Sequence, residues 1–351
     1  CRVCWVLGAG CWPVDERSDR PSHLRQTGSM GDHQPYPSTA TPETPETPEL
    51  VLTRDLRAKG LDGSEIRSVT AGLHRVRRGV FTTYEVSDRQ ARHLLATRAT
   101  LRMRQQVVAS HTSAAVAHGL WVPPELLDAV HVTATAPHVK DSTRNGVHLH
   151  AGPIPPHDVV SIDEVVATRI PRTVADCAMM LPFVDAVIVA DQALQQPDVT
   201  PQDLELALAA RGRRRGVARA RRVLRASDWG AESPGETRIR LILVDAGFDV
   251  ESQVVICRRD GTFVARVDLK LRDHPVFVEF DGRAKYQMGA SMEAVLWAEK
   301  LRFDKVHELG LEGFRVIWNH LARPRSVVER THQAIARAEK RGLGDTLFIE
   351  G

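Results

Sequence analysis

The stretch FVARVDLKLRDHPVFVEFDG, residues 263–282, alternates apolar and polar side chains in two consecutive runs. Alternation with a period of two predicts half-buried β-strands, and the two-residue Asp–His step between the runs predicts a hairpin loop. Such a loop fixes the register, so that Leu269 faces Val278 and Val267 faces Phe280. We therefore expect a hairpin in which every apolar residue lies opposite another apolar residue.

The other face of this hairpin carries two opposed acids, Asp268 and Glu279. Directly opposed residues lie about 5 Å apart, and two carboxylates at that distance repel by about 3 kcal/mol at an effective dielectric constant near 20. A bound Mg²⁺ would compensate this repulsion, because Mg²⁺ takes a few carboxylate ligands together with water and phosphate oxygens. The alternative is a solvated hairpin face whose charges point into water.

The length of 351 residues allows two or three domains, and a hydrophobic content of 42% predicts an ordinary buried core. No apolar run approaches the roughly 18 residues that a membrane helix needs, so we expect no membrane association. The net charge of +3 is unremarkable in size, but the basic residues are concentrated in a few segments.

The five cysteines do not form a disulfide framework, because three of them fall within the first eleven residues. Cys177 and Cys257 stand singly in apolar surroundings and are expected to be buried free thiols, which fits a reducing cytoplasm. Cys1 and Cys4 lack a second cysteine or histidine pair at zinc spacing, so no metal site is expected there.

Residues 1–49 are predicted to be a disordered tail or linker. The chain begins with Cys1 and its first methionine is Met30, so residues 1–29 are expected to be upstream sequence or an expression remnant. The motif Thr-Pro-Glu then repeats from residue 41 to residue 49, and proline-rich acidic repeats favour an extended, solvated linker.

Residues 50–86 have the pattern of a small winged helix-turn-helix: two short helices followed by a strand, a turn and a strand. Arg75, Arg77 and Arg78 would lie on the wing, where guanidinium groups can contact DNA phosphates. The alternative is a solvated basic hairpin that contacts another protein.

Residues 87–210 alternate helix-like and strand-like segments and are expected to form a mixed middle domain. Its histidines His131, His138, His148 and His150 suggest a metal, but their spacing matches no helix-based or loop-based ligand set. We therefore expect them to be strand-face or surface histidines.

A basic linker helix is predicted within residues 211–229, where eight arginines and no acid lie between Arg211 and Arg225. Such a helix can lie along a phosphate backbone, although a solvated linker helix remains the alternative. The arginines of this segment that we expect to contact DNA are Arg213, Arg214, Arg215, Arg219 and Arg222.

The C-terminal domain is predicted to span residues 230–342, followed by a short tail at 343–351. Ser233, Pro234 and Glu236 have the spacing of a capping box with proline at the first helical position. Glu236 also leads the apolar stripe of this helix, which must face the sheet. The elements that follow read as strand, hairpin, helix, strand and helix.

This order of elements resembles the PD-(D/E)XK nuclease core, and within that superfamily the very-short-patch-repair-type endonuclease-like domains. The likeness covers about residues 230–340 and depends on motifs taken together. The residues that carry it are Glu236 in ESPGETR, Asp268 in RVDL, Glu279 and Asp281 in VEFDG, Lys285 in GRAKY and Lys300 in WAEKLRFD.

The resemblance implies a metal-dependent endonuclease. Asp268, Glu279 and Asp281 would bind Mg²⁺ or Mn²⁺, and Glu236 would lie in the outer shell of the site. Asp281 departs from the family pattern, which places a lysine two residues after the glutamate. The resemblance therefore implies that Lys285 or Lys300 supplies the catalytic ammonium, and a domain without it would bind DNA but not cut it.

Residues 50–200 resemble the abortive-infection-type antitoxin proteins of actinobacteria, more loosely. The segments that carry this likeness are the wing at Leu73–Phe81 and the stretches HTSAAVAHGL and RIPRTVADCA. It implies a second hypothesis, a DNA-binding transcriptional regulator or antitoxin-like protein with an inactive nuclease fold.

Together the patterns predict an α/β protein of the α+β type: an N-terminal winged helix-turn-helix, a mixed middle domain and a C-terminal restriction-endonuclease-like core of order αβββαβα. The expected partner is DNA. The antitoxin-like resemblance adds a toxin-like or regulatory protein as a further partner, and a homodimer stays open. The sequence does not specify the DNA recognised or the biological pathway.

Overall fold

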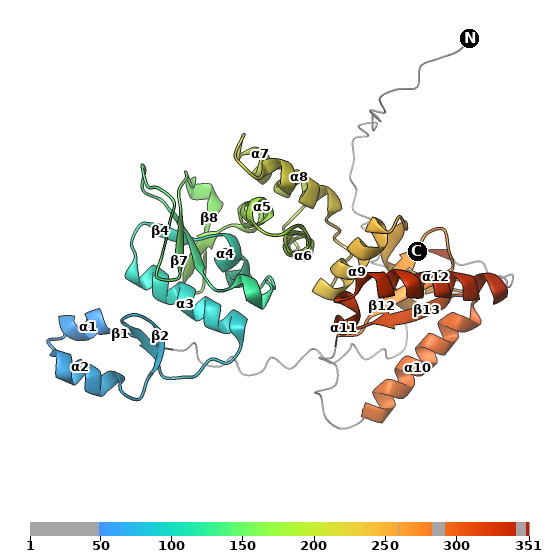
Figure 1. Cartoon of the computed structure of the whole chain (residues 1–351), viewed down its shortest axis with the longest axis horizontal. Coiled ribbons are helices and arrows are strands. Elements are labelled where there is room, and N and C mark those ends of the chain that lie inside the picture. The colour runs from blue at the N-terminus through green and yellow to red at the C-terminus, as the bar shows by residue number, and fades with distance from the viewer. Residues whose placement is uncertain (1–48, 259, 283–291, 342–348, 351) are drawn as a thin grey trace, which may run out of the picture. The chain divides into compact units, whose positions relative to one another are not determined.

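The computed structural model describes residues 49–258, 260–282, 292–341 and 349–350. These residues have an α+β fold, as predicted, with helices packed on three antiparallel or mixed sheets (Figure 1). The predicted tail at residues 1–48 lies outside the described ranges. Within those ranges, no helix is both long and apolar enough to cross a bilayer.

The N-terminal module has the two helices and the hairpin that the sequence predicts, plus one strand that it does not. Asp62 caps the second helix through a reciprocal capping box with Glu65. The extra strand pairs with the hairpin through Leu52 and Val80, which are both buried. The elements are β1 (Leu50–Leu52), α1 (Thr53–Ala58), α2 (Gly63–Thr70), β2 (His74–Arg77) and β3 (Val80–Thr82).

The middle domain contains a six-stranded sheet in the order β6-β7-β5-β4-β9-β8. Helices precede and follow its strands in the sequence. Strands β5 and β7 pair in parallel, as do β4 and β9. The first part contains α3 (Arg89–Met103), β4 (Val107–Ala109), α4 (His111–Ala117), β5 (Val130–Ala134), β6 (Ser142–Arg144), β7 (Val147–His150), β8 (Val159–Ile162) and β9 (Val165–Thr168).

Four helices complete the middle domain and share one apolar core with α4. Ala175 and Cys177 of α5 pack in this core with Val187 of α6 and Val223 of α8. Thr200 caps α7 ahead of a proline at the start of the helix. The helices are α5 (Ile170–Met180), α6 (Phe183–Leu194), α7 (Pro201–Ala209) and α8 (Val217–Ala226).

The C-terminal domain has the predicted helix, three strands, helix, strand and helix, plus a short helix before the last helix that the sequence did not predict. The prediction of a tail at residues 343–351 is wrong for residues 349–350, which pair with the sheet of this domain as a short strand. Its sheet has the order β13-β12-β11-β10-β14, in which β12 and β13 are parallel and the other pairs are antiparallel. The elements are α9 (Pro234–Asp245), β10 (Val250–Cys257), β11 (Phe263–Leu271), β12 (Val276–Phe280), α10 (Met292–Glu308), β13 (Glu312–Val316), α11 (Trp318–Leu321), α12 (Pro324–Arg341) and β14 (Ile349–Glu350).

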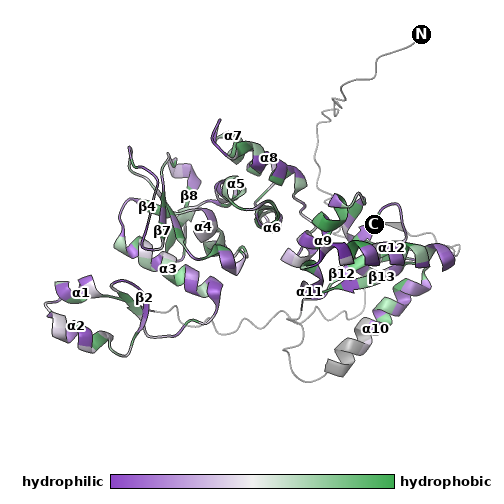
Figure 2. Ribbon diagram, in the orientation of Figure 1, coloured by the Kyte–Doolittle hydropathy of each residue, from purple (hydrophilic) through white to green (hydrophobic). Residues whose placement is uncertain are grey.

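Two separate hydrophobic clusters lie against this sheet. Ile239 of α9 and Val327 of α12 belong to one cluster, and Val306 of α10 belongs to the other. Helices α9 and α12 therefore cover one face of the sheet, and α10 covers the opposite face. Helix α12 carries both hydrophobic and hydrophilic residues in Figure 2. Its buried residues recur every three to four positions, which places them on one face, as in an amphipathic helix: Val327, Thr331, Ala334, Ile335 and Ala338.

The predicted hairpin register is confirmed at the paired residues Leu269 and Val278. The prediction that Val267 faces Phe280 in the same stripe is wrong, because Val267 packs with Phe277 in the cluster on the other face. Strand β11 thus changes face at the position between Val267 and Leu269. In the neighbouring strand β10, Gln253 has a left-handed backbone conformation at the same level.

One of the two expected free thiols is buried. Cys177 is completely buried within the middle-domain core, and Cys257 is half-buried at the end of β10. Neither thiol has a disulfide partner among the described residues.

Candidate functional site

Four acidic residues of the C-terminal domain lie in the neighbourhood of one residue, Phe280. The backbone N–H of Phe280 donates a 2.8 Å hydrogen bond to a carboxylate oxygen of Asp268. The two neighbours of Phe280 in the chain are also acids: Glu279 is the next-to-last residue of β12, and Asp281 follows directly after the strand. These contacts bring the end of β12 and the middle of β11 together.

The fourth acid, Glu236, is brought near Phe280 by the packing of helix α9. Gly235 lies against the ring of Phe280 so closely that a Cβ atom would overlap it, and Glu236 is the next residue. Trp318 holds the ring from another direction, edge to face, with 5.1 Å between the ring centroids. Glycine at position 235 therefore allows α9 to begin directly beside the end of β12.

Glu236 is buried and completely held by hydrogen bonds. Ser233 Oγ donates at 2.7 Å, the backbone N–H of Glu232 at 2.9 Å and Gln253 Nε2 at 2.8 Å. Ser233 is the N-cap, as predicted, but the reciprocal bond goes to the N–H of Glu232. Burial raises the pKa of Glu236, against the hydrogen bonds. Such a carboxylate can orient a neighbouring group more readily than it can bind an ion directly.

Gln253 was not among the residues singled out from the sequence. It has a left-handed backbone with φ of 56°, which is uncommon for a residue other than glycine. It lies at the level where the β10–β11 pairing skips from Ser252 to Val254. This local irregularity turns the Gln253 side chain to Glu236.

Glu279 is buried and bonded to arginine. Arg302 of α10 donates two hydrogen bonds to it, 2.7 Å from Nη1 and 2.9 Å from Nη2, and Arg315 Nε lies 3.5 Å from the second oxygen. A bidentate guanidinium pair is among the strongest neutralising contacts for a carboxylate. The negative charge of Glu279 is therefore met by arginine in this conformation.

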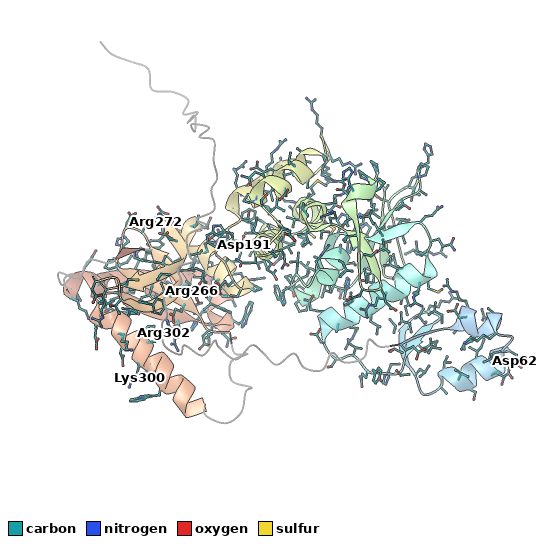
Figure 3. The ribbon with its side chains drawn as sticks, turned by 180° about the vertical axis from the view of Figure 1, so that it is seen from behind. Asp62, Asp191, Arg266, Arg272, Lys300 and Arg302 are labelled. Atoms are coloured by element: carbon teal, nitrogen blue, oxygen red, sulfur yellow. The ribbon has the colours of Figure 1, made fainter. Side chains whose placement is uncertain are left out.

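Of the two predicted lysines, Lys300 does not contact Glu279. Lys285 lies outside the described residues. Lys300 is exposed, and its ammonium lies 5.5 Å from the ring centroid of Trp297. Arg302, two residues further along α10, donates to Glu279 instead. Figure 3 labels Lys300 and Arg302. Arg302 could not be chosen from local pattern, because its contact depends on how α10 is rotated on the sheet.

The wing arginines separate into two kinds. Arg75 and Arg78 are exposed on the β2–β3 hairpin, where they remain accessible to a phosphate. Arg77 instead donates hydrogen bonds to Thr100 Oγ1 and, at 3.4 Å, to the carbonyl of Asn145. Burial lowers the pKa of Arg77, and repulsion by the positive charge of Arg104 lowers it further. Arg77 thus connects the wing to the middle domain.

The predicted DNA-contacting arginines of the basic segment, residues 211–229, also separate into exposed arginines and arginines that contact other helices. The helix predicted from residue 217 is α8, and Arg213, Arg214 and Arg215 precede it with exposed side chains. Arg219 donates to the carbonyl of Met179, and the Arg222 guanidinium lies 5.3 Å from the ring centroid of Phe183. The arginines before α8 are therefore available for other contacts, whereas those on α8 also contact α5 and α6.

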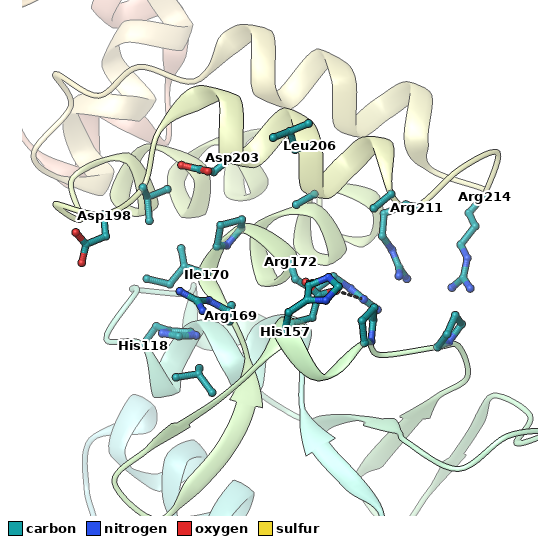
Figure 4. A pocket seen from close by; sticks show the side chains of 18 residues that line it. His118, His157, Arg169, Ile170, Arg172, Asp198, Asp203, Leu206, Arg211 and Arg214 are labelled. Atoms are coloured by element: carbon teal, nitrogen blue, oxygen red, sulfur yellow. Dashed lines mark hydrogen bonds and ion pairs between the residues drawn. The ribbon is translucent and has the colours of Figure 1, made fainter. Parts of the chain in front are cut away.

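A basic cavity of about 620 Å³ lies in the middle domain (Figure 4). Arg172 and Arg211 line it, and both are held by the fully buried carboxylate of Asp176, at 2.8 Å and 3.1 Å. Sequence reasoning missed this cavity, because Arg211 looked like one more member of a solvated arginine run. The missed signal was Asp176, an acid within an otherwise apolar helix.

Comparison with protein-family models finds no match. Two curated proteins of Mycobacterium tuberculosis are similar to this chain: uncharacterized protein MT2308 of strain CDC 1551 / Oshkosh and uncharacterized protein Rv2248 of strain ATCC 25618 / H37Rv. Each is 26% identical over 178 residues, which cover 50% of this chain and 64% of the relative. The chain therefore spans less than two thirds of these relatives, and neither name states an activity.

Proposed function

We propose that residues 230–341 form a divalent-metal-dependent endonuclease domain acting on DNA. The observation that carries this proposal is the neighbourhood of Phe280. Asp268 accepts a hydrogen bond from the Phe280 N–H, Glu279 and Asp281 flank Phe280 in the chain, and Glu236 follows the glycine that packs on its ring. Carboxylate oxygens are the donors that Mg²⁺ and Mn²⁺ prefer, so the residues present fit such an ion.

In this proposal Asp268, Glu279 and Asp281 hold the ion. A bound divalent cation would lower the pKa of a water molecule and stabilise charge on the scissile phosphate. Glu236 keeps Gln253 in place at 2.8 Å, as an outer positioning residue. Arg302 releases Glu279 and places its guanidinium on the phosphate, the role that the sequence assigned to Lys285 or Lys300.

The exposed arginines are proposed to bind the duplex. Arg75 and Arg78 on the wing and the run at residues 213–215 offer guanidinium groups to phosphates, which favours a binding affinity that falls with salt. The proposed location is the cytoplasm. The antitoxin-like resemblance adds a toxin-like or regulatory protein, or a second copy of this chain, as a proposed partner.

Plasmid cleavage tests the proposal. Wild type should cleave in the presence of Mg²⁺ or Mn²⁺ and not with EDTA, and Asp268→Ala and Glu279→Ala should each lose at least about 100-fold, the scale of one preorganised electrostatic group. Asp273→Ala is the matched control, because this acid lies exposed in the loop of the same hairpin. Equal cleavage by all four proteins would remove these residues from the reaction.

A second function is favoured by one specific observation. Both oxygens of Glu279 are bonded to Arg302, and Asp281 stands where the nuclease pattern has lysine. A DNA-binding regulator or antitoxin-like protein with an inactive nuclease fold fits that arrangement. It requires DNA binding that survives Asp268→Ala and weakens steeply with salt. Metal-dependent cutting by the purified wild type would count against this alternative.

A further inference from the structure

Four histidines of the middle domain meet on one face of its sheet. The parallel pairing of β5 with β7 places His131 beside His148 and Thr133 beside His150. His111 joins them from the start of α4, and its ring stacks on His150 with 3.7 Å between the centroids. The expectation that the strand histidines lie on a strand face is confirmed, but the sequence did not reveal that they meet.

Three of these side chains have converging nitrogen atoms. One ring nitrogen from each of His111, His131 and His150 lies within 4.8 Å of the other two. His131 Nδ1 and His150 Nε2 are already 2.9 Å apart. Zinc–nitrogen bonds of about 2.0–2.1 Å in a tetrahedral site place ligand nitrogens roughly 3.3 Å from one another. Small side-chain rotations would therefore bring all three nitrogens to ligand distance.

We propose that His111, His131 and His150 bind one transition-metal ion, zinc first, with a fourth coordination position open to the adjacent cavity. Imidazole nitrogen is a preferred ligand of zinc, copper and nickel. The cavity has a volume of about 650 Å³, and His111 and His150 form part of its wall. Three protein ligands with an open position is the arrangement of zinc sites that bind water or substrate.

The surroundings of His111 support the proposal. Its Nδ1 lies 3.0 Å from Ser110 Oγ, which leaves Nε2 for a ligand when Nδ1 carries the proton. Ser110 is itself held by a 2.8 Å hydrogen bond from Thr133 Oγ1. Metal-binding histidines usually donate their second N–H to such a partner, which fixes the ring and its tautomer.

The cavity beside the three rings is basic. Its wall contains Arg211, Arg214, Arg215 and Arg219 together with the acids Asp141 and Asp176. The buried carboxylate of Asp176 pairs with Arg211 and also with Arg172.

Cobalt substitution of the full chain tests the site. Protein stripped with a chelator should bind one equivalent of Co²⁺, with the visible bands of a four-coordinate nitrogen site and no thiolate-to-cobalt charge-transfer band. Zn²⁺ should displace the Co²⁺. His131→Ala and His150→Ala should each weaken binding by more than about 100-fold, and Ser110→Ala by roughly tenfold, as expected for an outer-shell partner.

Three controls separate this site from others. His138→Ala removes an exposed histidine of the same domain and should leave Co²⁺ binding unchanged. Asp268→Asn removes a proposed nuclease ligand and should also leave it unchanged, so failure of the nuclease proposal does not affect this one. Circular dichroism of each variant reports folding. If the His150→Ala variant does not fold, Ser110→Ala decides, because it keeps all three ligands.

Two results would overturn the proposal. One is a folded, metal-free wild type that takes up no Co²⁺ or Zn²⁺. The other is Co²⁺ binding that persists at wild-type affinity in folded His131→Ala and His150→Ala, or that is lost in Asp268→Asn instead. Either result would leave the histidines as a hydrogen-bonded stack of neutral rings.

Discussion

Arg240 of α9 donates a 2.8 Å hydrogen bond to the carboxylate of Asp191 on α6, and both side chains are buried. The second partner of Asp191 is Thr237 of α9, and the third is the backbone N–H of Asp228. Burial raises the pKa of Asp191 to about 6, so the carboxylate is ionised at pH 7.5. This contact joins the last part of the middle domain to the first helix of the C-terminal domain.

Asp191→Ala should reduce the free energy of unfolding by about 3 kcal/mol at pH 7.5, because it leaves a buried guanidinium without its carboxylate. Urea denaturation measures this change. Asp128→Ala is the control: its carboxylate pairs with Arg89 at 2.8 Å but is exposed, so the expected loss is below about 1 kcal/mol. Equal losses in the two variants would show that Asp191 does not hold the domains together.

Arg302→Met should make the protein depend on metal for stability. The substitution leaves the buried Glu279 with the longer contact to Arg315 Nε, at 3.5 Å. If Glu279 is a metal ligand, Mn²⁺ should raise the melting temperature of Arg302→Met by several degrees more than that of wild type, because ligands that bind the folded state stabilise it. Differential scanning calorimetry with and without Mn²⁺ measures the two shifts.

Lys300→Met is the matched control for that experiment, because Lys300 is exposed on the same helix. Its Mn²⁺ shift should equal that of wild type. A shift that is the same in all three proteins would argue that Mn²⁺ does not use Glu279, and would favour the binding-only alternative.

Local alternation was enough to predict the hairpin. The register at Leu269 and Val278 follows from a short loop and a period of two, both of which are properties of neighbouring residues. The change of face after Val267 could not be predicted in this way. It coincides with the left-handed backbone of Gln253 on another strand, and no pattern within β11 specifies that strand's conformation.

The residues of the candidate sites also fall into those that a local pattern identifies and those that depend on tertiary packing. Asp268 and Glu279 could be chosen because they share one hairpin. Arg302 reaches Glu279 through the orientation of a helix that comes after the hairpin, so its contact depends on tertiary packing. The three converging histidines depend on a parallel pairing of β5 with β7, which skips over β6 and leaves no short-range signature.

Gly235→Ala should lower the free energy of unfolding by about 1–3 kcal/mol, the range for overpacking, because the new methyl group overlaps the ring of Phe280. The double variant with Phe280→Leu should recover part of the loss, since the smaller side chain makes room. Gly282→Ala is the control, with its nearest ring atom 3.2 Å away, and should cost less. Additive losses in the double variant would contradict this contact.

His93 should make stability depend on pH. Its Nδ1 lies 3.0 Å from the carbonyl of Leu127, which can only accept, so Nδ1 carries the proton. Its Nε2 then accepts from Ser113 Oγ at 2.8 Å. Burial lowers the pKa of His93 below its ordinary value of 6.5, so below pH 6.5 the unfolded chain binds a proton that the folded chain does not. This contribution is fully present above pH 6.5 and is lost as the pH falls.

His93→Gln tests this sign. The stability difference between wild type and the variant should be largest above pH 7 and should shrink as the pH falls below 6.5, by up to about 1.4 kcal/mol per pH unit. Urea midpoints between pH 7.5 and pH 5 measure it. His74→Gln, at an exposed histidine of β2, should show no such trend. A difference that stays constant with pH would mean that His93 takes up its proton equally in the folded and unfolded chain.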